Sequence, residues 1–142
     1  MSRSFVFSTP LRFAHCDAAG IGYYPRYLEL CDAAIEDWTQ SILGISRRTM
    51  HCDLQLALPT VRMNATFVRP GRLGDRLDFE VTVKNVGRTS VALEADVTSL
   101  GEPRFRVDFV QVLTCMTRMR PKPWPDEWRG RLEAVLNKEK QA

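Results

Sequence analysis

The chain has 142 residues, of which 44% are apolar and 26% are charged, and its formal charge is +3. This length predicts one domain over residues 1–142, with a core at about residues 4–119, and leaves no room for a second domain. The small charge gives no basis for nucleic-acid binding, and no apolar run approaches the roughly 18 residues that a membrane span needs.

The first predicted element is a strand. Apolar residues alternate with mostly polar neighbours from Phe5 to Phe13, and Pro10 interrupts this strand or places it at a sheet edge. The N-terminal stretch of residues 1–7 shows neither a long apolar region nor a cleavage-site pattern. No signal peptide is therefore expected, and the predicted location is cytoplasmic.

A loop with one carboxylate and two glycines follows. Gly20 and Gly22 allow backbone turns that a residue with a Cβ would resist, and Pro25 suits the first position of a helix. A helix is expected to begin near Tyr24, and its first N–H groups can hold a carbonyl oxygen as that oxygen gains negative charge. The pattern of a carboxylate, Asp17, beside such amides predicts a site that hydrolyses an acyl bond. The alternative is a structural Asp17 that bonds the backbone two residues on, a common arrangement beside glycine.

The spacing of apolar residues predicts a helix from Pro25 to Leu43, which Gly44 ends. Acidic and amide side chains, including Asp32, trace its polar face. Residues 45–58 predict a loop or a short helix. The apolar stripe consists of Tyr27, Leu30, Cys31, Ala34, Ile35, Trp38 and Ile42.

Strands dominate the following part of the chain. Four segments alternate apolar and polar residues, and the last of them becomes apolar on both faces, as a central strand does. Turn residues at Asn85–Arg88 and Leu100–Pro103 predict an antiparallel meander. One long helix with such a sheet is an α+β arrangement. The segments are 61–68, 77–83, 90–97 and 105–113.

The tail over residues 120–142 predicts a linker and a short amphipathic helix carrying Trp128 and Leu132, packed on the sheet or on a neighbouring subunit. The cysteines show no spacing typical of a metal site, so no metal is expected, and structural roles are predicted for Cys31 and Cys115. The chain also lacks a Gly-x-Ser-x-Gly elbow, a phosphate loop and a dinucleotide fingerprint. A carboxylate is therefore the candidate for any hydrolytic chemistry.

The segment Asp17-Ala-Ala-Gly20-Ile-Gly22-Tyr-Tyr24-Pro25 resembles the Asp-x-x-Gly-x-x-Tyr/His-x-x-x-Tyr signature of the hotdog-fold acyl-CoA thioesterases. It is most similar to the 4-hydroxybenzoyl-CoA thioesterase branch, although Ala18 stands where that branch has proline. The resemblance implies a hotdog fold, in which a curved, mostly antiparallel sheet wraps one long helix. It also implies a homodimer or homotetramer, and an acyl-CoA substrate with no other cofactor.

The resemblance further implies residue roles. Asp17 would act as nucleophile or general base, with Tyr24 contributing its backbone N–H and Gly20 shaping the catalytic loop. Tyr27 and Asp32 are candidates for contact with the acyl group, although a core aromatic and a solvated helix face are the structural alternatives. A partner subunit's strand would supply Asn64, Ala65 and Thr66 to the acyl pocket. Independently of the resemblance, Lys84, Arg88, Thr89 and Ser90, with Arg69 and Arg72, are candidates to hold the phosphates of CoA, because guanidinium groups suit phosphate oxygens.

The predicted function is hydrolysis of an acyl-CoA thioester with an aromatic or medium-chain acyl group. One alternative is a thioesterase for acyl carrier protein, with Arg118, Arg120, Lys122 and the Arg129–Arg131 pair as a basic docking face. The other is a non-catalytic module that binds acyl-CoA. Fold alone does not separate these, because one scaffold hosts many activities.

Overall fold

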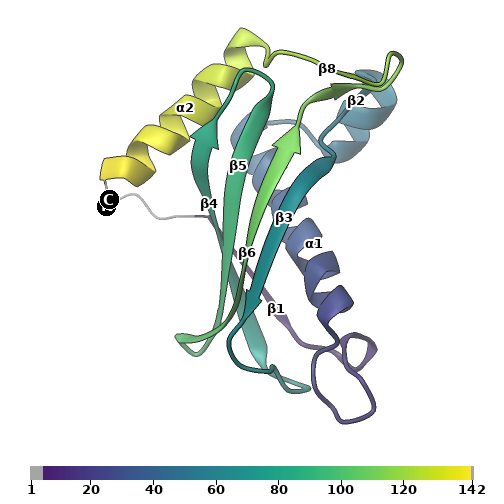
Figure 1. The fold of residues 1–142 in the computed structure, drawn as a ribbon, viewed down its shortest axis with the longest axis vertical. Coiled ribbons are helices and arrows are strands. Elements are labelled where there is room, and N and C mark those ends of the chain that lie inside the picture. Colours follow the sequence, from purple (N-terminus) through teal and green to yellow (C-terminus); the bar gives the residue numbers. More distant parts are fainter. Residues whose placement is uncertain (1–4, 142) are drawn as a thin grey trace.

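The computed structural model describes residues 5–141, so residues 1–4, part of the stretch on which the signal-peptide expectation rests, and Ala142 lie outside the described residues. The main sheet is fully antiparallel (Figure 1). Its strands lie in the spatial order β1 (Phe5–Pro10), β4 (Arg76–Val86), β5 (Ser90–Ser99), β6 (Glu102–Val112) and β3 (Thr60–Phe67).

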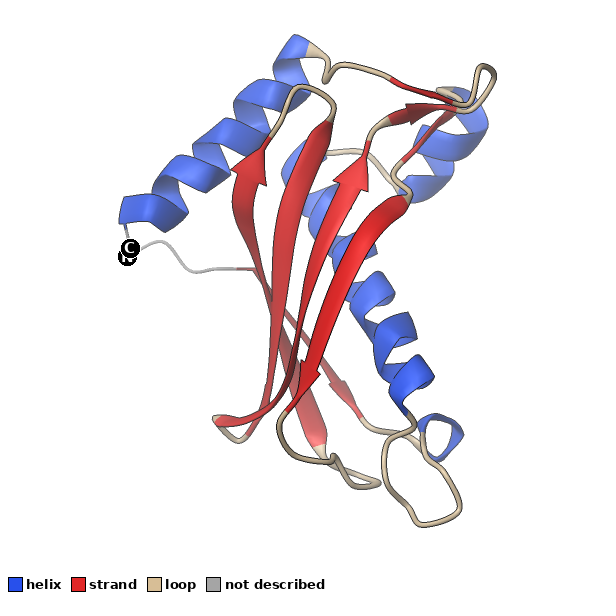
Figure 2. Cartoon of the chain, in the orientation of Figure 1, coloured by secondary structure: helices blue, strands red, loops and turns tan. Residues whose placement is uncertain are grey.

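The long helix α1 (Tyr24–Leu43) crosses one face of this curved sheet (Figure 2). Its predicted apolar stripe is buried in the core, with Cys31 and Ala34 fully covered, except for Ile42, which is partly buried. The helix begins at Tyr24, as predicted, and Pro25 occupies one of its first two positions, where no intrahelical donor is lost. Gly44 ends it in the left-handed conformation, with φ of 70°.

The alternation of inward and outward side chains that the sequence predicted for the strands is confirmed in the sheet. Leu77 and Val91 begin buried rows that continue at every second residue of β4 and β5, and Phe105 begins the row of β6. Apolar side chains of the sheet and of α1 form one core. This is the predicted α+β arrangement, one long helix wrapped by a mostly antiparallel sheet.

The segment between α1 and β3 was predicted as a loop or short helix and contains both a one-turn helix and a short strand. The helix η2 spans Thr49–Asp53, and β2 spans Leu56–Ala57. β2 pairs with β7 (Thr114–Cys115), which pairs with β8 (Arg120–Pro121) in a second, three-stranded sheet. Cys115 in β7 is only partly covered, whereas Cys31 is buried as predicted.

The C-terminal helix α2 (Asp126–Gln141) packs on β4 and α1 (Figure 1). β1 pairs with β4 only from Arg76 to Val81. Beyond Val81 on β4, the carboxylate of Glu139 accepts the backbone N–H of Val83 at 2.6 Å. Trp128 and Leu132 join the same core as α1 and the sheet. The tail therefore covers the part of the β4 edge that β1 leaves open.

Within residues 5–141, no helix is both long enough and apolar enough to cross a membrane.

Candidate active site

The loop between β1 and α1 is organised around Asp17. Its Oδ1 accepts the N–H of Ala19 at 2.9 Å and that of Ile21 at 3.3 Å, and its own N–H donates to the Ile21 carbonyl at 2.8 Å. The side chain thus makes the two-residue backbone contact that the structural alternative predicted. The second carboxylate oxygen, Oδ2, accepts no hydrogen bond from the described part of the chain, and Asp17 is exposed.

Gly20 fixes the turn in this loop. It adopts φ of +75°, its N–H donates to the Asp17 carbonyl at 3.0 Å, and its carbonyl accepts from Leu73 at 2.9 Å. The N–H of Gly20 is already bonded inside the turn, so it is not free to bind a substrate oxygen. Gly20 therefore contributes the shape of the loop.

Tyr27 ties the loop to the end of β3. Its phenol oxygen accepts the N–H of Gly71 at 2.9 Å, while the N–H of Gly22 donates to the Gly71 carbonyl at 2.9 Å. A Cβ on Gly22 would lie 2.1 Å from this phenol oxygen, so only glycine fits there. Burial raises the pKa of the Tyr27 phenol above its ordinary value. Tyr27 also stacks on Phe105, with ring centroids 4.5 Å apart, and is mainly a core residue.

The start of α1 presents one backbone donor to the loop. The N–H groups of Arg26 and Tyr27 both donate to the Tyr23 carbonyl, and Pro25 has no N–H. The N–H of Tyr24 has no acceptor within residues 5–141. It carries the positive end of the helix dipole, so it is suited to an oxygen that gains negative charge.

Asp17 and Tyr24 line one cavity of about 360 Å³ at this end of the molecule. Its wall also includes Gly22 and the rings of Tyr23 and Tyr27. The other lining residues lie at and just after the end of β3, and of these only Arg69 was a site candidate from the sequence, as a phosphate contact. They are Phe67, Val68, Arg69 and Pro70.

The neighbouring His15 and Cys16 do not form a nucleophile and base. The Nδ1 of His15 accepts the N–H of Arg12 at 2.9 Å, and the Cys16 thiol donates to the Arg12 carbonyl at 3.4 Å. Burial, and then the charge of Asp17, raise the pKa of the Cys16 thiol. The thiol is therefore held in its protonated form, which is not nucleophilic. Within residues 5–141 no group of three or more His, Cys, Asp or Glu side chains is placed to hold a metal.

The other predicted contact residues lie outside this cavity. Asp32 borders a second cavity further along α1, where Arg47 pairs with it. Ala65 packs on the core, Asn64 is exposed, and Thr66 lines a shallow hollow of about 250 Å³ beside Arg106.

The predicted phosphate contacts lie at the β4–β5 turn, at the opposite end of the sheet from the loop that carries Asp17 (Figure 1). Lys84 pairs with Glu94 at 3.5 Å. The carbonyls of Arg88 and Ser90 accept hydrogen bonds from Trp124 in the C-terminal tail, and the Thr89 carbonyl accepts the N–H of Leu113 after β6. Within one protomer, none of these residues reaches the Asp17 cavity.

Comparison with known proteins places these features in a family. The model of the thioesterase-like superfamily matches residues 11–132. A curated relative, 1,4-dihydroxy-2-naphthoyl-CoA hydrolase of Synechococcus elongatus, is 33% identical over 106 residues, which cover 74% of this chain and 67% of the relative.

Solved structures share the fold. A 1,4-dihydroxy-2-naphthoyl-CoA thioesterase from Synechocystis has a TM-score of 0.83 at 22% identity, covering 93% of this chain and 97% of that one. A protein of Staphylococcus aureus, solved in complex with CoA, has a TM-score of 0.88 at 13% identity, covering 96% of this chain and 87% of that one.

Proposed function

The chain belongs to the thioesterase-like superfamily, and from this premise we propose that it hydrolyses the CoA thioester of an aromatic acid to the free acid and CoA. The curated relative from Synechococcus elongatus, named as a hydrolase of an aromatic CoA ester, supports this substrate class. The rings of Tyr23, Tyr24 and Phe67 around the cavity suit an aromatic acyl group.

One observation carries the proposal: Asp17 and Tyr24 line the same cavity, and within residues 5–141 Oδ2 of Asp17 accepts no hydrogen bond and the N–H of Tyr24 has no acceptor. The thioester carbonyl oxygen accepts the Tyr24 N–H, which stabilises the negative charge that develops during attack. Asp17 then either adds to the carbonyl carbon or takes a proton from an attacking water. Addition expels CoA thiolate and leaves a mixed anhydride that water hydrolyses, whereas the water route gives the acid in one step.

CoA itself suits the edge of this cavity. Arg69 lines it, and its guanidinium also pairs with Glu102 at 3.1 Å. Guanidinium groups suit phosphate oxygens, and the net charge of +3 favours a polyanionic ligand. The structural relative solved in complex with CoA supports the same ligand.

Asp17→Asn is the decisive substitution. Asparagine keeps a carbonyl oxygen where Oδ1 accepts the N–H groups of Ala19 and Ile21, so the loop is preserved. It removes the charge needed to add to the thioester or to accept a proton. We expect kcat for benzoyl-CoA or hydroxybenzoyl-CoA hydrolysis to fall at least ~10³-fold, with an unchanged unfolding free energy.

The matched control is Asp37→Asn, an exposed carboxylate on α1 that lines neither the Asp17 cavity nor the cavity beside Asp32. It should keep the parental rate. An Asp17→Asn protein that hydrolyses these esters at near parental rate would show that Asp17 only holds its loop.

A carrier-protein substrate has less support. Arg129 donates to the carbonyls of Gly87 and Arg88, and Arg131 pairs with Glu127, so this pair is already engaged. Only the exposed residues of the β7–β8 hairpin region remain for docking: Arg118, Arg120 and Lys122. Saturable hydrolysis of free CoA esters without any carrier protein excludes this alternative. Binding of CoA esters without turnover would favour the non-catalytic alternative.

A further inference from the structure

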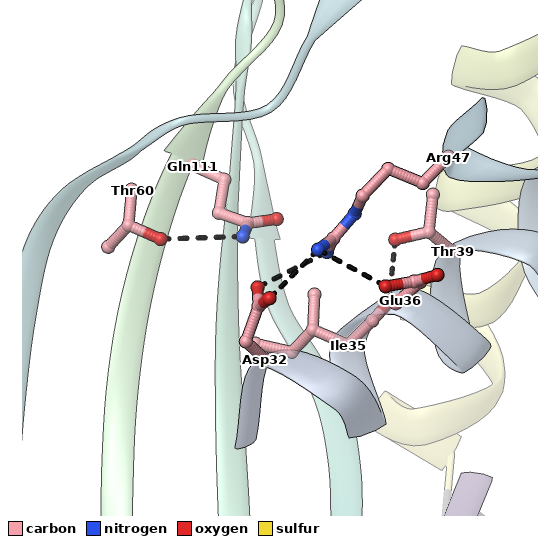
Figure 3. Close-up of polar contacts among 7 residues, drawn as sticks. All are labelled: Asp32, Ile35, Glu36, Thr39, Arg47, Thr60 and Gln111. Atoms are coloured by element: carbon pink, nitrogen blue, oxygen red, sulfur yellow. Dashed lines mark hydrogen bonds and ion pairs between the residues drawn. The ribbon is translucent and has the colours of Figure 1, made fainter. Parts of the chain in front are cut away.

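The β7–β8 hairpin carries a group of exposed cations. Residues 116–123, which form its turn, β8 and the start of the tail, are all exposed and include three cations but no acidic residue. None of these cations forms an ion pair within residues 5–141. Arg47, by contrast, lies between the carboxylates of Asp32 and Glu36 (Figure 3). The three hairpin cations are Arg118, Arg120 and Lys122.

Neighbouring segments make this end of the molecule positive. Trp124, just after the hairpin, donates its N–H to the Arg88 carbonyl at 3.1 Å, which brings the β4–β5 turn beside the hairpin (Figure 1). β7 also pairs with β2, which contacts η2. Five cations and two carboxylates, those of Asp53 and Asp126, occur in these segments. The segments are residues 48–57, 86–90 and 114–126.

Exposed apolar side chains accompany the cations. Met116 and Met119 bracket the turn of the hairpin and are 37% and 77% exposed. Leu54, which is 47% exposed, is close to them, because the N–H of Met116 donates to the carbonyl of the next residue, Gln55, at 2.9 Å. Methionine is flexible and polarizable, so it adapts to irregular apolar surroundings. The hairpin therefore presents an apolar tip flanked by positive charge.

Met119 occupies a backbone conformation that does not suit it. Its φ of 53° lies in the left-handed region, which glycine and asparagine favour. Its side chain gains little burial within the protomer in return. Folding of the hairpin alone does not explain a methionine at this position, whereas contact of its side chain with an apolar phase outside the protomer does.

We propose that the β7–β8 hairpin docks the protein on an anionic lipid bilayer. Arg118, Arg120 and Lys122 lie against the lipid phosphates, and the two methionines enter the boundary between headgroups and acyl chains. Each cation near an anionic surface raises the binding constant roughly fivefold, so docking by three cations is reversible. It also weakens as salt screens the charges. This inference does not depend on the proposed function.

The apolar tip separates a bilayer from other polyanions. Residues 116–123 contain no aromatic side chain, whereas single-stranded nucleic acid is held by stacking on aromatic rings. An acidic protein would pair with the cations without needing Met119 at the turn. The loop that carries Asp17 lies at the opposite end of the sheet (Figure 1). Docking through the hairpin therefore holds the Asp17 cavity away from the bilayer.

Vesicle co-sedimentation of the full chain tests the role of charge. The parental protein should bind vesicles of equimolar phosphatidylcholine and phosphatidylglycerol at least ~10-fold more tightly than pure phosphatidylcholine at low salt. Arg118→Glu should weaken binding to the mixed vesicles at least ~10-fold, and Lys122→Glu is a second charge reversal at an exposed position. Arg76→Glu is the matched control. It makes the same change of charge at an exposed position at the start of β4, far from the hairpin, and should keep the parental affinity.

The role of the apolar tip is tested by Met119→Asn. Asparagine tolerates the left-handed conformation, so the turn is preserved while the apolar side chain is lost. Binding to the mixed vesicles should weaken at least ~3-fold, because less apolar surface leaves water. Leu100→Asn is the matched control, since Leu100 has φ of 50° and is 95% exposed at the β5–β6 turn. It should bind as the parental protein does.

Equal affinity for the two kinds of vesicle, or parental affinity in Arg118→Glu, overturns the inference. A loss in Arg118→Glu without a loss in Met119→Asn also overturns it, and assigns the hairpin to an acidic protein or a nucleic acid. A smaller mass of Arg118→Glu in light scattering would make the hairpin a contact between copies of this chain, which again contradicts docking on lipid. Vesicle binding by a protein that hydrolyses no CoA ester overturns the proposed function alone.

Discussion

At the scale of single residues, the two oxygens of the Asp17 carboxylate differ in their contacts. Oδ1 holds the loop through the N–H groups of Ala19 and Ile21, and Oδ2 is left for chemistry. The structural and the catalytic interpretation of this residue are therefore compatible. Only a substitution that keeps the first role while removing the charge distinguishes them, which is why asparagine is more informative than alanine.

Tyr27 is predicted to be a stability residue of the site. In Tyr27→Phe the ring still stacks on Phe105, but the buried N–H of Gly71 loses its acceptor. We expect a loss of about 1–3 kcal/mol in unfolding free energy, measured by urea denaturation. Tyr23→Phe is the control, because the Tyr23 side chain is 50% exposed and should cost little. Equal stabilities of the two variants would contradict this assignment.

At the scale of elements, α2 completes an edge that β1 leaves unfinished. Glu139 accepts the Val83 N–H, the first inward position of β4 beyond the reach of β1. Burial raises the pKa of the Glu139 carboxyl, the Val83 N–H and Lys84 lower it, and Glu80 raises it further, with a net rise. The packing of α2 is thus coupled to protonation of the Glu139 carboxyl group.

The direction of the pKa shift of Glu139 predicts how the unfolding free energy depends on pH. Because the folded pKa lies above the ordinary value of 4.5, the folded state holds the proton more tightly than the unfolded state. The contribution of Glu139 is complete below pH 4.5 and is lost as the pH rises through the folded value. Relative to Glu139→Gln, the parental protein should therefore gain unfolding free energy as the pH is lowered from about 7.

Urea denaturation at a series of pH values measures this difference. Glu133→Gln is the control, since Glu133 pairs with Arg129 within α2 and is exposed. A parental protein that loses stability relative to Glu139→Gln on acidification would show that the ionised carboxylate, and not the protonated one, favours docking of α2.

At the scale of the whole molecule, β3 is an open edge of the sheet with exposed apolar side chains. Val61 is 61% exposed, and Met63, Phe67 and Val68 are also exposed. An apolar edge strand of this kind is a template for pairing with another chain. We propose that two copies associate through β3, the strand that carries Asn64, which was predicted to serve a partner's acyl pocket.

Val61→Lys is predicted to weaken this association. A lysine on an edge strand opposes pairing, and an exposed position tolerates it without loss of the fold. Light scattering coupled to size exclusion should show a smaller assembly for Val61→Lys than for the parental protein, which we expect to be a homodimer or homotetramer. Val6→Lys is the matched control, because Val6 is 51% exposed on β1, the opposite edge of the sheet. Unchanged assembly in Val61→Lys would exclude β3 as the interface.

The sequence by itself determined the local features. The apolar spacing predicted α1 to within a residue of its bounds, the alternation predicted β4, β5 and β6, and the glycines after Asp17 predicted the turn of its loop. These predictions are correct because helix and strand periodicities, and the backbone freedom of glycine, depend on residues that are close in sequence.

Only the tertiary structure decided which residues meet. The Phe67–Pro70 wall of the first cavity, the Arg47 contact that occupies Asp32, and the Trp124 contact that brings the β4–β5 turn beside the hairpin have no signal in local spacing. Tyr27 and Gly71 are 44 positions apart, and Glu139 and Val83 are 56 apart. Contacts over such separations depend on how the sheet curves around α1, and the periodicity of either partner segment does not encode that curvature.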